Sequence, residues 1–279
     1  MTDQRVTAQP RPLALVTGAS AGIGREFSEQ LAARGYDLLI VARDAARLDA
    51  FARQLATRHG IVAHAISADL SLDDGVSRLI DEIRVRGPLA VLVNNAGFGT
   101  NGPLATAPTE SQEAMLRLHV LAPMRLTQAV LPAMLERGAG WLINVSSIAG
   151  FTSAAGRVNY CATKAYLTNF SEGLAAELAG SGVRVQALCP GFTHTEFHHR
   201  MGFDKSEIPP RLWLDAGAVV RASLAAIERG GPVVCVPGAR YKLIVLLLRV
   251  LPARWRMRLA WLAARRRAGA GPERARTAV

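Results

Sequence analysis

Short runs of apolar residues alternate with amphipathic segments along most of the chain. The first run, residues 13–17, ends in a cluster of glycines, and apolar residues at helical spacing follow until Gly35. Six more apolar runs bounded by turn residues predict strands, and the periodic segments between them predict helices. The strands are predicted at 13–17, 37–43, 61–70, 89–97, 140–147, 183–191 and 232–238, and the later helices at 48–55, 76–83, 110–136, 160–178 and 216–228.

These strands are apolar along most of their length rather than only at every second position. Strands of this kind are buried on both faces, and their alternation with helices is typical of a parallel sheet covered by helices on both sides. The pattern therefore predicts an α/β fold with a doubly wound, seven-stranded parallel sheet of the Rossmann type. No repeat or linker interrupts it before residue 240, so the body is expected to be a single domain.

The two ends of the chain differ from this body. Residues 1–11 are polar, so we expect a flexible tail and not a signal peptide. Residues 12–239 form the predicted domain, and residues 240–279 form a basic, apolar appendix with helical spacing. The appendix holds eleven basic residues and one acid, Glu273, and so carries +10 of the net charge of +11. The body is nearly neutral, and its charge does not indicate binding to nucleic acid.

The cysteine content points to a reducing environment. Cys161, Cys189 and Cys235 are odd in number, and their spacing matches neither a disulfide framework nor a metal site. We interpret them as small buried residues, and the cytoplasm is the expected location.

The first predicted strand runs into the segment "TGASAGIG", residues 17–24, and a helix follows. Gly18, Gly22 and Gly24 have the spacing G-x3-G-x-G, which differs from the more familiar G-x-G-x-x-G. Glycine lets the backbone approach a pyrophosphate, and the helix N-terminus beyond it offers N–H groups and a positive dipole. A plain tight turn is the alternative. The strand before the glycines, the helix after them and a second strand about twenty residues on favour a dinucleotide site.

The end of the second predicted strand indicates which dinucleotide. An acid there would bind the ribose 2′-hydroxyl of NAD, but this chain has Arg43. A cation suits a 2′-phosphate, so the expected cofactor is NADP (NADPH), and Arg25 could add to the same charge. The alternative for Arg43 is a solvated arginine paired with Asp44.

Further motifs accompany the glycine turn: Asp69, "NNAG" at 94–97, Ser147, "YCATK" at 160–164 and "PGFTHT" at 190–195. Together they resemble the short-chain dehydrogenase/reductase family over about residues 12–238. Parts of the chain are also similar to the branch of 17β-hydroxysteroid and long-chain 3-oxoacyl reductases. The cofactor-binding residues expected from these motifs and this resemblance are Gly18, Ser20, Gly22, Ile23, Gly24, Arg43, Asp69, Leu70, Asn95, Ala96, Gly97, Tyr160, Lys164, Pro190, Gly191, Thr193 and Thr195.

The resemblance also implies roles for single positions. Asp69 would accept a hydrogen bond from the adenine amino group. Asn94 would lie beside the cofactor at the end of the fourth strand, and Gly97 would permit its close approach. Pro190, Gly191 and Thr193 would flank the nicotinamide, and Thr195 would lie near its carboxamide or the phosphates.

Tyr160 and Lys164 lie four residues apart on a predicted helix, and this spacing puts them on one face. A free tyrosine, with a pKa of about 10, is a poor base at neutral pH, and a nearby ammonium lowers that pKa. We predict that Tyr160 is the acid/base, that Lys164 tunes it, and that Ser147 donates to the substrate oxygen. Ser146 is the neighbouring alternative, because adjacent side chains of a strand point to opposite faces. A plain surface pair of Tyr160 and Lys164 is the alternative for the helix.

One position departs from the family pattern. His119, in "LHVLAP", stands where the family usually has an asparagine that positions a water between the active-site lysine and solvent. We include His119 among the catalytic residues, with a relay through its backbone or its ring as the expected role. Weakened turnover and a packed core histidine are the alternatives.

The segment 192–215 would cover the substrate in the family. It is rich in apolar residues, which favours an apolar or lipid-like carbonyl compound. The stretch "HTEFHH" within it suggests metal binding, but no cysteine or acid completes a ligand set, so no metal is expected.

The appendix has three interpretations. Its apolar run at 243–248, extended to 251, is too short to span a bilayer. It could pack on the body and complete the substrate pocket or a dimer interface, lie on an anionic membrane through 240–267, or bind nucleic acid. The first two are favoured and can coexist, which would place the enzyme at the inner face of a membrane. A homo-oligomer is expected, because relatives are commonly dimers or tetramers.

These observations predict an NADP-dependent oxidoreductase that interconverts a ketone and a secondary alcohol by hydride transfer. Tyr160 would be the acid/base, and the small-molecule partner an apolar or lipid-like carbonyl or alcohol. A different class of function is the alternative: a catalytically weak nucleotide-binding regulator or membrane-tethered scaffold, which only His119 supports.

Overall fold

The structure is a computed structural model of the chain, and it describes residues 11–197, 208–252, 254–255, 257–258 and 261–262. The predicted tail, residues 1–11, therefore lies almost wholly outside the described residues, as does the centre of the segment 192–215.

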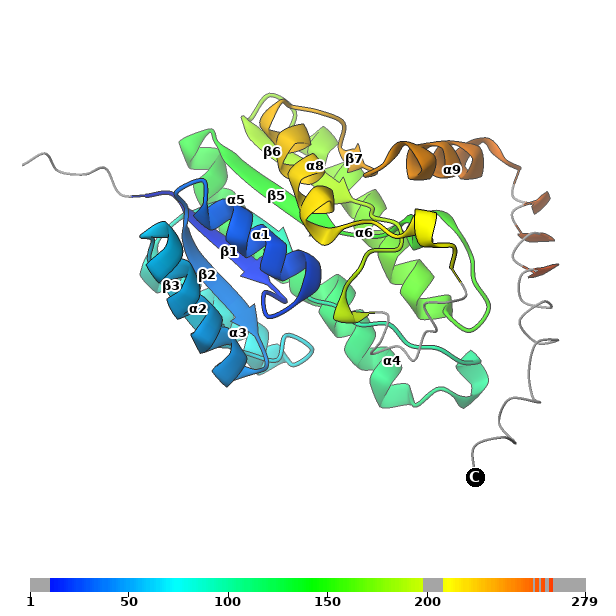
Figure 1. Cartoon of the computed structure of the whole chain (residues 1–279), viewed down its shortest axis with the longest axis horizontal. Helices are drawn as coiled ribbons and strands as arrows, with labels where there is room; N and C mark the ends of the chain where they lie inside the picture. Colours follow the sequence, from blue (N-terminus) through cyan, green and yellow to red (C-terminus); the bar gives the residue numbers. More distant parts are fainter. Residues whose placement is uncertain (1–10, 198–207, 253, 256, 259–260, 263–279) are drawn as a thin grey trace, which may run out of the picture.

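A seven-stranded sheet forms the centre of the molecule, and every neighbouring pair of strands is parallel (Figure 1). The strand order is β3-β2-β1-β4-β5-β6-β7, so the chain moves outward first to one side of β1 and then to the other. This confirms the predicted doubly wound fold of the Rossmann type. The strands are β1 (Leu13–Thr17), β2 (Asp37–Ala42), β3 (Ala63–Ser67), β4 (Leu89–Asn94), β5 (Gly140–Val145), β6 (Val183–Leu188) and β7 (Val234–Cys235).

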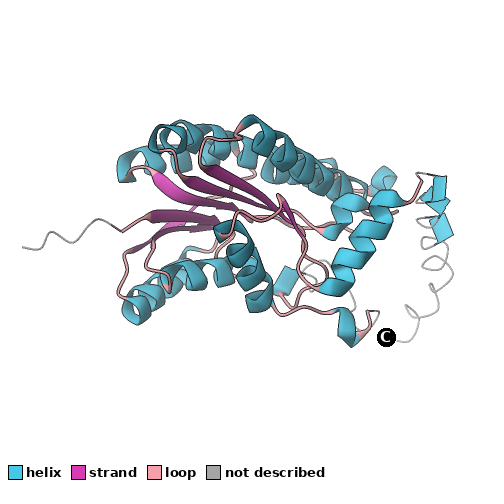
Figure 2. Ribbon diagram, turned by 90° about the horizontal axis from the view of Figure 1, so that it is seen from above, coloured by secondary structure: helices cyan, strands magenta, loops and turns pink. Residues whose placement is uncertain are grey.

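Helices cover both faces of the sheet (Figure 2). One core lies between the sheet and α1 (Gly22–Ala32), α2 (Ala45–His59) and α8 (Ala216–Glu228). The other lies beneath α3 (Asp73–Arg86), α5 (Ala122–Arg137) and α6 (Val158–Glu177). Within β1, Leu15 belongs to the second core and Val16 to the first, because successive side chains of a strand point to opposite faces. This explains the continuously apolar strands.

The helix expected at 110–136 is divided. It consists of α4 (Thr109–Leu116), a π-helical turn η2 (Arg117–Leu121), and α5. Pro123 lies in the first turn of α5 and has no N–H to donate to the His119 carbonyl four residues back, as a continuous α-helix would require. The division therefore falls at the candidate site residue His119.

The described part of the appendix packs on the body. Helix α9 (Ala239–Val250) contacts the short helix η3 (Ile148–Phe151), and it buries Tyr241 and Val245. The predicted boundary at 239/240 thus coincides with the start of α9. Across the described ranges, no helix is both long enough and apolar enough to cross a membrane.

Candidate active site

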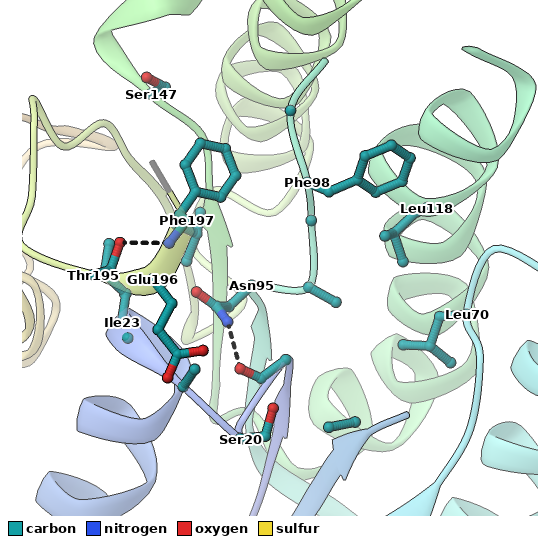
Figure 3. Close-up of a pocket in the computed structure, with 18 of the residues that line it drawn as sticks. Ser20, Ile23, Leu70, Asn95, Phe98, Leu118, Ser147, Thr195, Glu196 and Phe197 are labelled. Atoms are coloured by element: carbon teal, nitrogen blue, oxygen red, sulfur yellow. Dashed lines mark hydrogen bonds between the residues drawn. The ribbon is translucent and has the colours of Figure 1, made fainter. Parts of the chain in front are cut away.

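A pocket of about 480 Å³ opens at the carboxyl ends of the strands, which is the usual ligand position in open parallel sheets. It brings together segments that are far apart in the sequence, from the glycine turn after β1 to the loop after β6 (Figure 3). All the predicted cofactor-binding residues line it except Gly24, and Ser147 lines it as well. The six sequence motifs therefore meet in one place.

The glycine turn has the backbone that its sequence predicts. Gly18 and Gly22 have φ values of 68° and 55°, in the left-handed region that favours glycine. A Cβ on Gly18 would lie 2.8 Å from Asn95 Nδ2, so the turn also needs glycine in order to pack against the end of β4. Gly24 does not line the pocket. It is buried in α1, where a Cβ would overlap the Gly18 carbonyl, so it allows α1 to pack closely on the turn.

Hydrogen bonds fix the glycine turn to the "NNAG" loop. Thr17 Oγ1 accepts from the backbone N–H groups of Asn95 and Ala96, at 2.9 and 3.0 Å. The Asn95 side chain donates to the Thr17 carbonyl at 2.8 Å. Asn94 differs from the prediction: its side chain is buried and donates to Asn144 Oδ1 at 2.9 Å, so it braces the sheet instead of lining the pocket.

Arg43 and Asp69, which follow β2 and β3, both line the pocket at the end where the adenine is expected. Burial would raise the pKa of Asp69, but two hydrogen bonds from Ser71 and the charge of Arg43 outweigh it and hold this pKa below its usual value. Asp44 accepts from the backbone N–H of Arg47 and so caps α2.

Arg25 does not contribute to this end of the pocket. Its guanidinium lies 4.0 Å from the centre of the Phe51 ring and donates to Gln54. Both partners belong to α2, and Arg25 is not among the residues that line the pocket. The suggestion that Arg25 adds to the positive charge there is therefore wrong.

The catalytic candidates lie at the other end of the pocket. Tyr160 and Lys164 are both buried, on α6, so they are not a surface pair. Lys164 Nζ donates to the Val145 carbonyl at 2.8 Å and lies 5.8 Å from the centre of the Tyr160 ring.

The pKa shifts of this pair follow from burial. Burial raises the pKa of Tyr160 to about 12, and a hydrogen bond with Ser147 opposes the shift only in part. Burial also lowers the pKa of Lys164 to about 8. The expectation that the phenol pKa lies below its usual value is therefore wrong for the groups of the chain itself, because desolvation raises this pKa and the hydrogen bond with Ser147 and the charge of Arg157 oppose it only in part.

The two neighbouring serines follow β5 and both line the pocket, but their hydroxyls have different partners. Ser146 donates to the Lys164 carbonyl at 2.6 Å and lies 2.9 Å from Thr168 Oγ1, so its hydroxyl faces α6. Ser147 begins the short helix η3, where its Oγ accepts from the Ala149 N–H at 3.1 Å. The prediction that Ser147 faces Tyr160, and not Ser146, agrees with this geometry.

His119 is buried behind Tyr160 and does not line the pocket. Its Nε2 accepts from the Phe98 N–H at 3.1 Å, and its Nδ1 lies 3.0 Å from Thr163 Oγ1, which itself donates to the Tyr160 carbonyl. These bonds require a neutral ring with the proton on Nδ1. Burial first, and then the charge of Lys164, holds the pKa of His119 well below its usual value. A proton relay through the ring is not supported, and the geometry favours the packed histidine.

The sequence alone did not identify two apolar residues of the pocket, Phe98 and Leu118. Figure 3 shows them on the side opposite Thr195 and Glu196. Phe197 also lines the pocket, and its ring centre is 5.9 Å from that of Tyr160. The only local signals in the sequence are that Phe98 directly follows "NNAG" and that Leu118 directly precedes His119.

Within the described ranges, no group of three His, Cys, Asp or Glu residues is arranged to hold a metal ion. His194 stacks on Trp213, with ring centres 5.0 Å apart, and His198 and His199 lie outside the described residues. All three cysteines are free and buried, as interpreted from the sequence.

The fold and this pocket define a dinucleotide-binding oxidoreductase. The sequence model of the short chain dehydrogenase family matches residues 12–205, and the chain belongs to this family. A 3-oxoacyl-(acyl-carrier-protein) reductase of Aquifex aeolicus is 34% identical over 185 residues, which cover 66% of this chain and 75% of that protein.

Two solved structures resemble the whole molecule. A short-chain dehydrogenase from Sphingobium yanoikuyae in complex with NADPH has a TM-score of 0.77 and 34% identity, with 96% of this chain and 98% of the other covered. The bulky-bulky ketone specific alcohol dehydrogenase from Comamonas testosteroni has a TM-score of 0.73 and 30% identity, with 96% and 97% covered. Coverage of 96% means that the likeness extends beyond residue 238 into the C-terminal segment.

Proposed function

We propose that the protein is an NADPH-dependent reductase that converts an apolar ketone into a secondary alcohol. The observation that carries the proposal is that Tyr160, Lys164 and Ser147 line the same pocket as the glycine turn and Arg43. The residues fit a dinucleotide: the glycine turn precedes the N-terminus of α1, and Asp69 and Arg43 lie at the adenine end.

The chain's own groups suit the reductive direction. Bound NADPH supplies the hydride, and the substrate oxygen then needs a proton. A phenol with a pKa of about 12 is fully protonated at neutral pH, so Tyr160 can donate that proton. Ser147 can donate a hydrogen bond to the same oxygen, and the charge of the Lys164 ammonium, 5.8 Å from the ring centre, attracts the phenolate as it forms, although it does not offset the desolvation of the resting phenol.

The apolar end of the pocket supports the substrate class. Phe197 lies against the Tyr160 ring and Phe98 lies against His119 behind it, and a carbonyl compound with apolar groups on both sides would bury those groups against these rings. The similarity to an enzyme specific for bulky-bulky ketones agrees with this choice.

The direct test mixes purified protein with NADPH and each of a panel of bulky apolar ketones. The oxidation of NADPH is followed by the absorbance of its nicotinamide ring. Oxidation of NADPH that depends on a ketone supports the reductase. Tight binding of NADPH without turnover on any ketone would favour the nucleotide-binding regulator instead.

Arg43 is proposed to select NADPH through the 2′-phosphate. We expect Arg43→Ala to raise the Kd for NADPH by about 10- to 100-fold, the range of one lost hydrogen bond to a charged group, and to leave the Kd for NADH nearly unchanged. Fluorescence titration measures both constants. Arg25→Ala is the matched control, because its guanidinium stacks on Phe51 outside the pocket. An equal loss for both nucleotides in Arg43→Ala would contradict the proposal.

The outer face of α9 is proposed to lie on an anionic membrane surface. Leu243, Leu246, Leu247 and Val250 are 56% to 69% exposed and recur at i, i+3, i+4 and i+7, which forms one apolar stripe. The sequence from 229 to 272 has no acidic residue and ten basic ones, so the net charge of this part of the chain complements anionic lipid headgroups. Figure 1 shows α9 at one end of the molecule, beyond β7.

Sedimentation with lipid vesicles tests this contact. The wild type should sediment with phosphatidylglycerol vesicles at low salt and much less with phosphatidylcholine vesicles. Leu246→Ser/Leu247→Ser should abolish sedimentation, while Leu72→Ser, an equally exposed leucine at the start of α3, should not. Unchanged sedimentation of the double variant, or a dimer in light scattering that the double variant alone loses, would overturn the membrane proposal. The homo-oligomer and the cytoplasmic location stay predictions.

A further inference from the structure

Tyr241 of α9 packs directly behind Gly191, a residue that lines the pocket. Its side chain is 2% exposed, and its hydroxyl makes two hydrogen bonds. It accepts from the Phe192 N–H at 3.1 Å and donates to the Leu212 carbonyl at 2.6 Å. Phe192 and Leu212 lie near opposite ends of the segment 192–215, so one oxygen atom ties the two ends together.

The ring of Tyr241 explains why residue 191 is a glycine. A Cβ on Gly191 would overlap the ring atoms of Tyr241, so no larger residue fits while the tyrosine stays in place. The resemblance to the family assigned Gly191 to the nicotinamide. The structure adds a second requirement, because α9 packs directly against the backbone that lines the pocket.

Backbone hydrogen bonds extend this tie toward the pocket. Leu214 N–H donates to the Phe192 carbonyl at 2.8 Å, and His194 N–H donates to the Leu214 carbonyl at 2.9 Å. Thr193 forms a parallel bridge with Leu214. We call the short stretch 192–197 the pocket arm. Its first residues are held by Tyr241 on one side and by Leu214 on the other.

The pocket arm lines the pocket along its length: Phe197 lies beside Tyr160, Thr195 lies against the glycine turn, and Glu196 pairs with Arg47 of α2. Thr193, Thr195, Glu196 and Phe197 all line the pocket. Phe197 lies against the Tyr160 ring, while the adenine end of the pocket is built from β2, β3 and the glycine turn. A shift of the arm would therefore act on the ketone end through Phe197, whereas Arg43 and Asp69, which line the other end, do not belong to the arm.

We propose that Tyr241 is a positioning residue: its hydroxyl holds the pocket arm, and the C-terminal helix thereby sets the shape of the ketone-binding end. The kinetic part of this inference rests on the proposed reductase function, but the structural part does not. Tyr241 touches neither the substrate nor the catalytic groups, so its effect should appear as substrate fit and not as loss of the chemical step.

The experiment compares the wild type with Tyr241→Phe, which removes one oxygen and keeps the ring. Peptide-resolved hydrogen exchange on the full chain should show about 3- to 10-fold faster exchange across 192–197, the factor expected from one lost hydrogen bond. KM for a bulky apolar ketone should rise by a similar factor, with kcat and its pH profile nearly unchanged. Binding of 2′,5′-ADP, which occupies only the adenine end, should stay the same.

Tyr36→Phe is the matched control. Tyr36 lies just before the amino end of β2, whereas the pocket lies at the carboxyl ends of the strands, so the same loss of a hydroxyl should alter neither exchange at 192–197 nor KM. Unchanged exchange in Tyr241→Phe would overturn the tie, and faster exchange with an unchanged KM would overturn its role in substrate fit. A wild type that reduces no ketone would refute the reductase function, and the exchange data would still decide whether Tyr241 holds the arm.

Discussion

Tyr160→Phe is expected to lower kcat for ketone reduction by about 10²- to 10⁴-fold, the usual contribution of a positioned general acid. The ring would keep its packing against Phe197 and its place over Lys164, because only the hydroxyl is removed. The Kd for NADPH should therefore change little. Stopped-flow measurement of a single turnover, together with fluorescence titration of NADPH, separates the two effects.

Tyr166→Phe provides the control on the same helix. Tyr166 stacks on Phe170, with ring centres 5.6 Å apart, and is not among the pocket residues. Its variant should retain wild-type turnover. Near-normal single-turnover rates in Tyr160→Phe would mean that another group, or water, protonates the product oxygen.

Lys164→Met should lower turnover by about 10²-fold or more, the cost of removing one preorganised electrostatic group. Its effect on stability should depend on pH. The folded chain holds the Lys164 pKa at about 8, below the ordinary value of 10.5, so between these values the unfolded chain binds more protons. The free energy of unfolding of the wild type should therefore rise with pH relative to the variant.

The pKa of Lys164 also sets the size of this pH effect. Between pH 7 and pH 9 the free energy of unfolding of the wild type should rise by about 1 kcal/mol relative to that of Lys164→Met. A difference of one bound proton between the unfolded and folded chains corresponds to about 1.4 kcal/mol per pH unit. Urea unfolding of both proteins at the two pH values measures the difference. A difference that does not change with pH would show that Lys164 is not destabilised by burial.

Local sequence patterns were sufficient for the sheet and for most of the pocket. Buried parallel strands are continuously apolar, and glycines with positive φ at the end of β1 mark the phosphate turn, so both signals lie within a few neighbouring residues. The order of strands also places the carboxyl ends of β1 to β6 at one pocket. This is why sixteen of the seventeen predicted cofactor-binding residues line it.

The remaining features depend on which way a side chain turns. The sequence could not show that Asn94 faces Asn144, or that Gly24 meets the Gly18 carbonyl, because both depend on packing between elements. The pKa of Tyr160 had the wrong predicted direction for a similar reason. The spacing to Lys164 is visible in the sequence, but the burial that dominates the shift is not.

The fit between the Tyr241 ring and Gly191 has an evolutionary consequence. The two positions are fifty residues apart, yet position 191 cannot accept a side chain while the tyrosine at 241 is kept. A homologue with a small residue at position 241 has space for a side chain at position 191, whereas a homologue with tyrosine at 241 should keep glycine at 191. We therefore expect descendants of this gene to vary these two codons together, with a mutation at 241 arriving first.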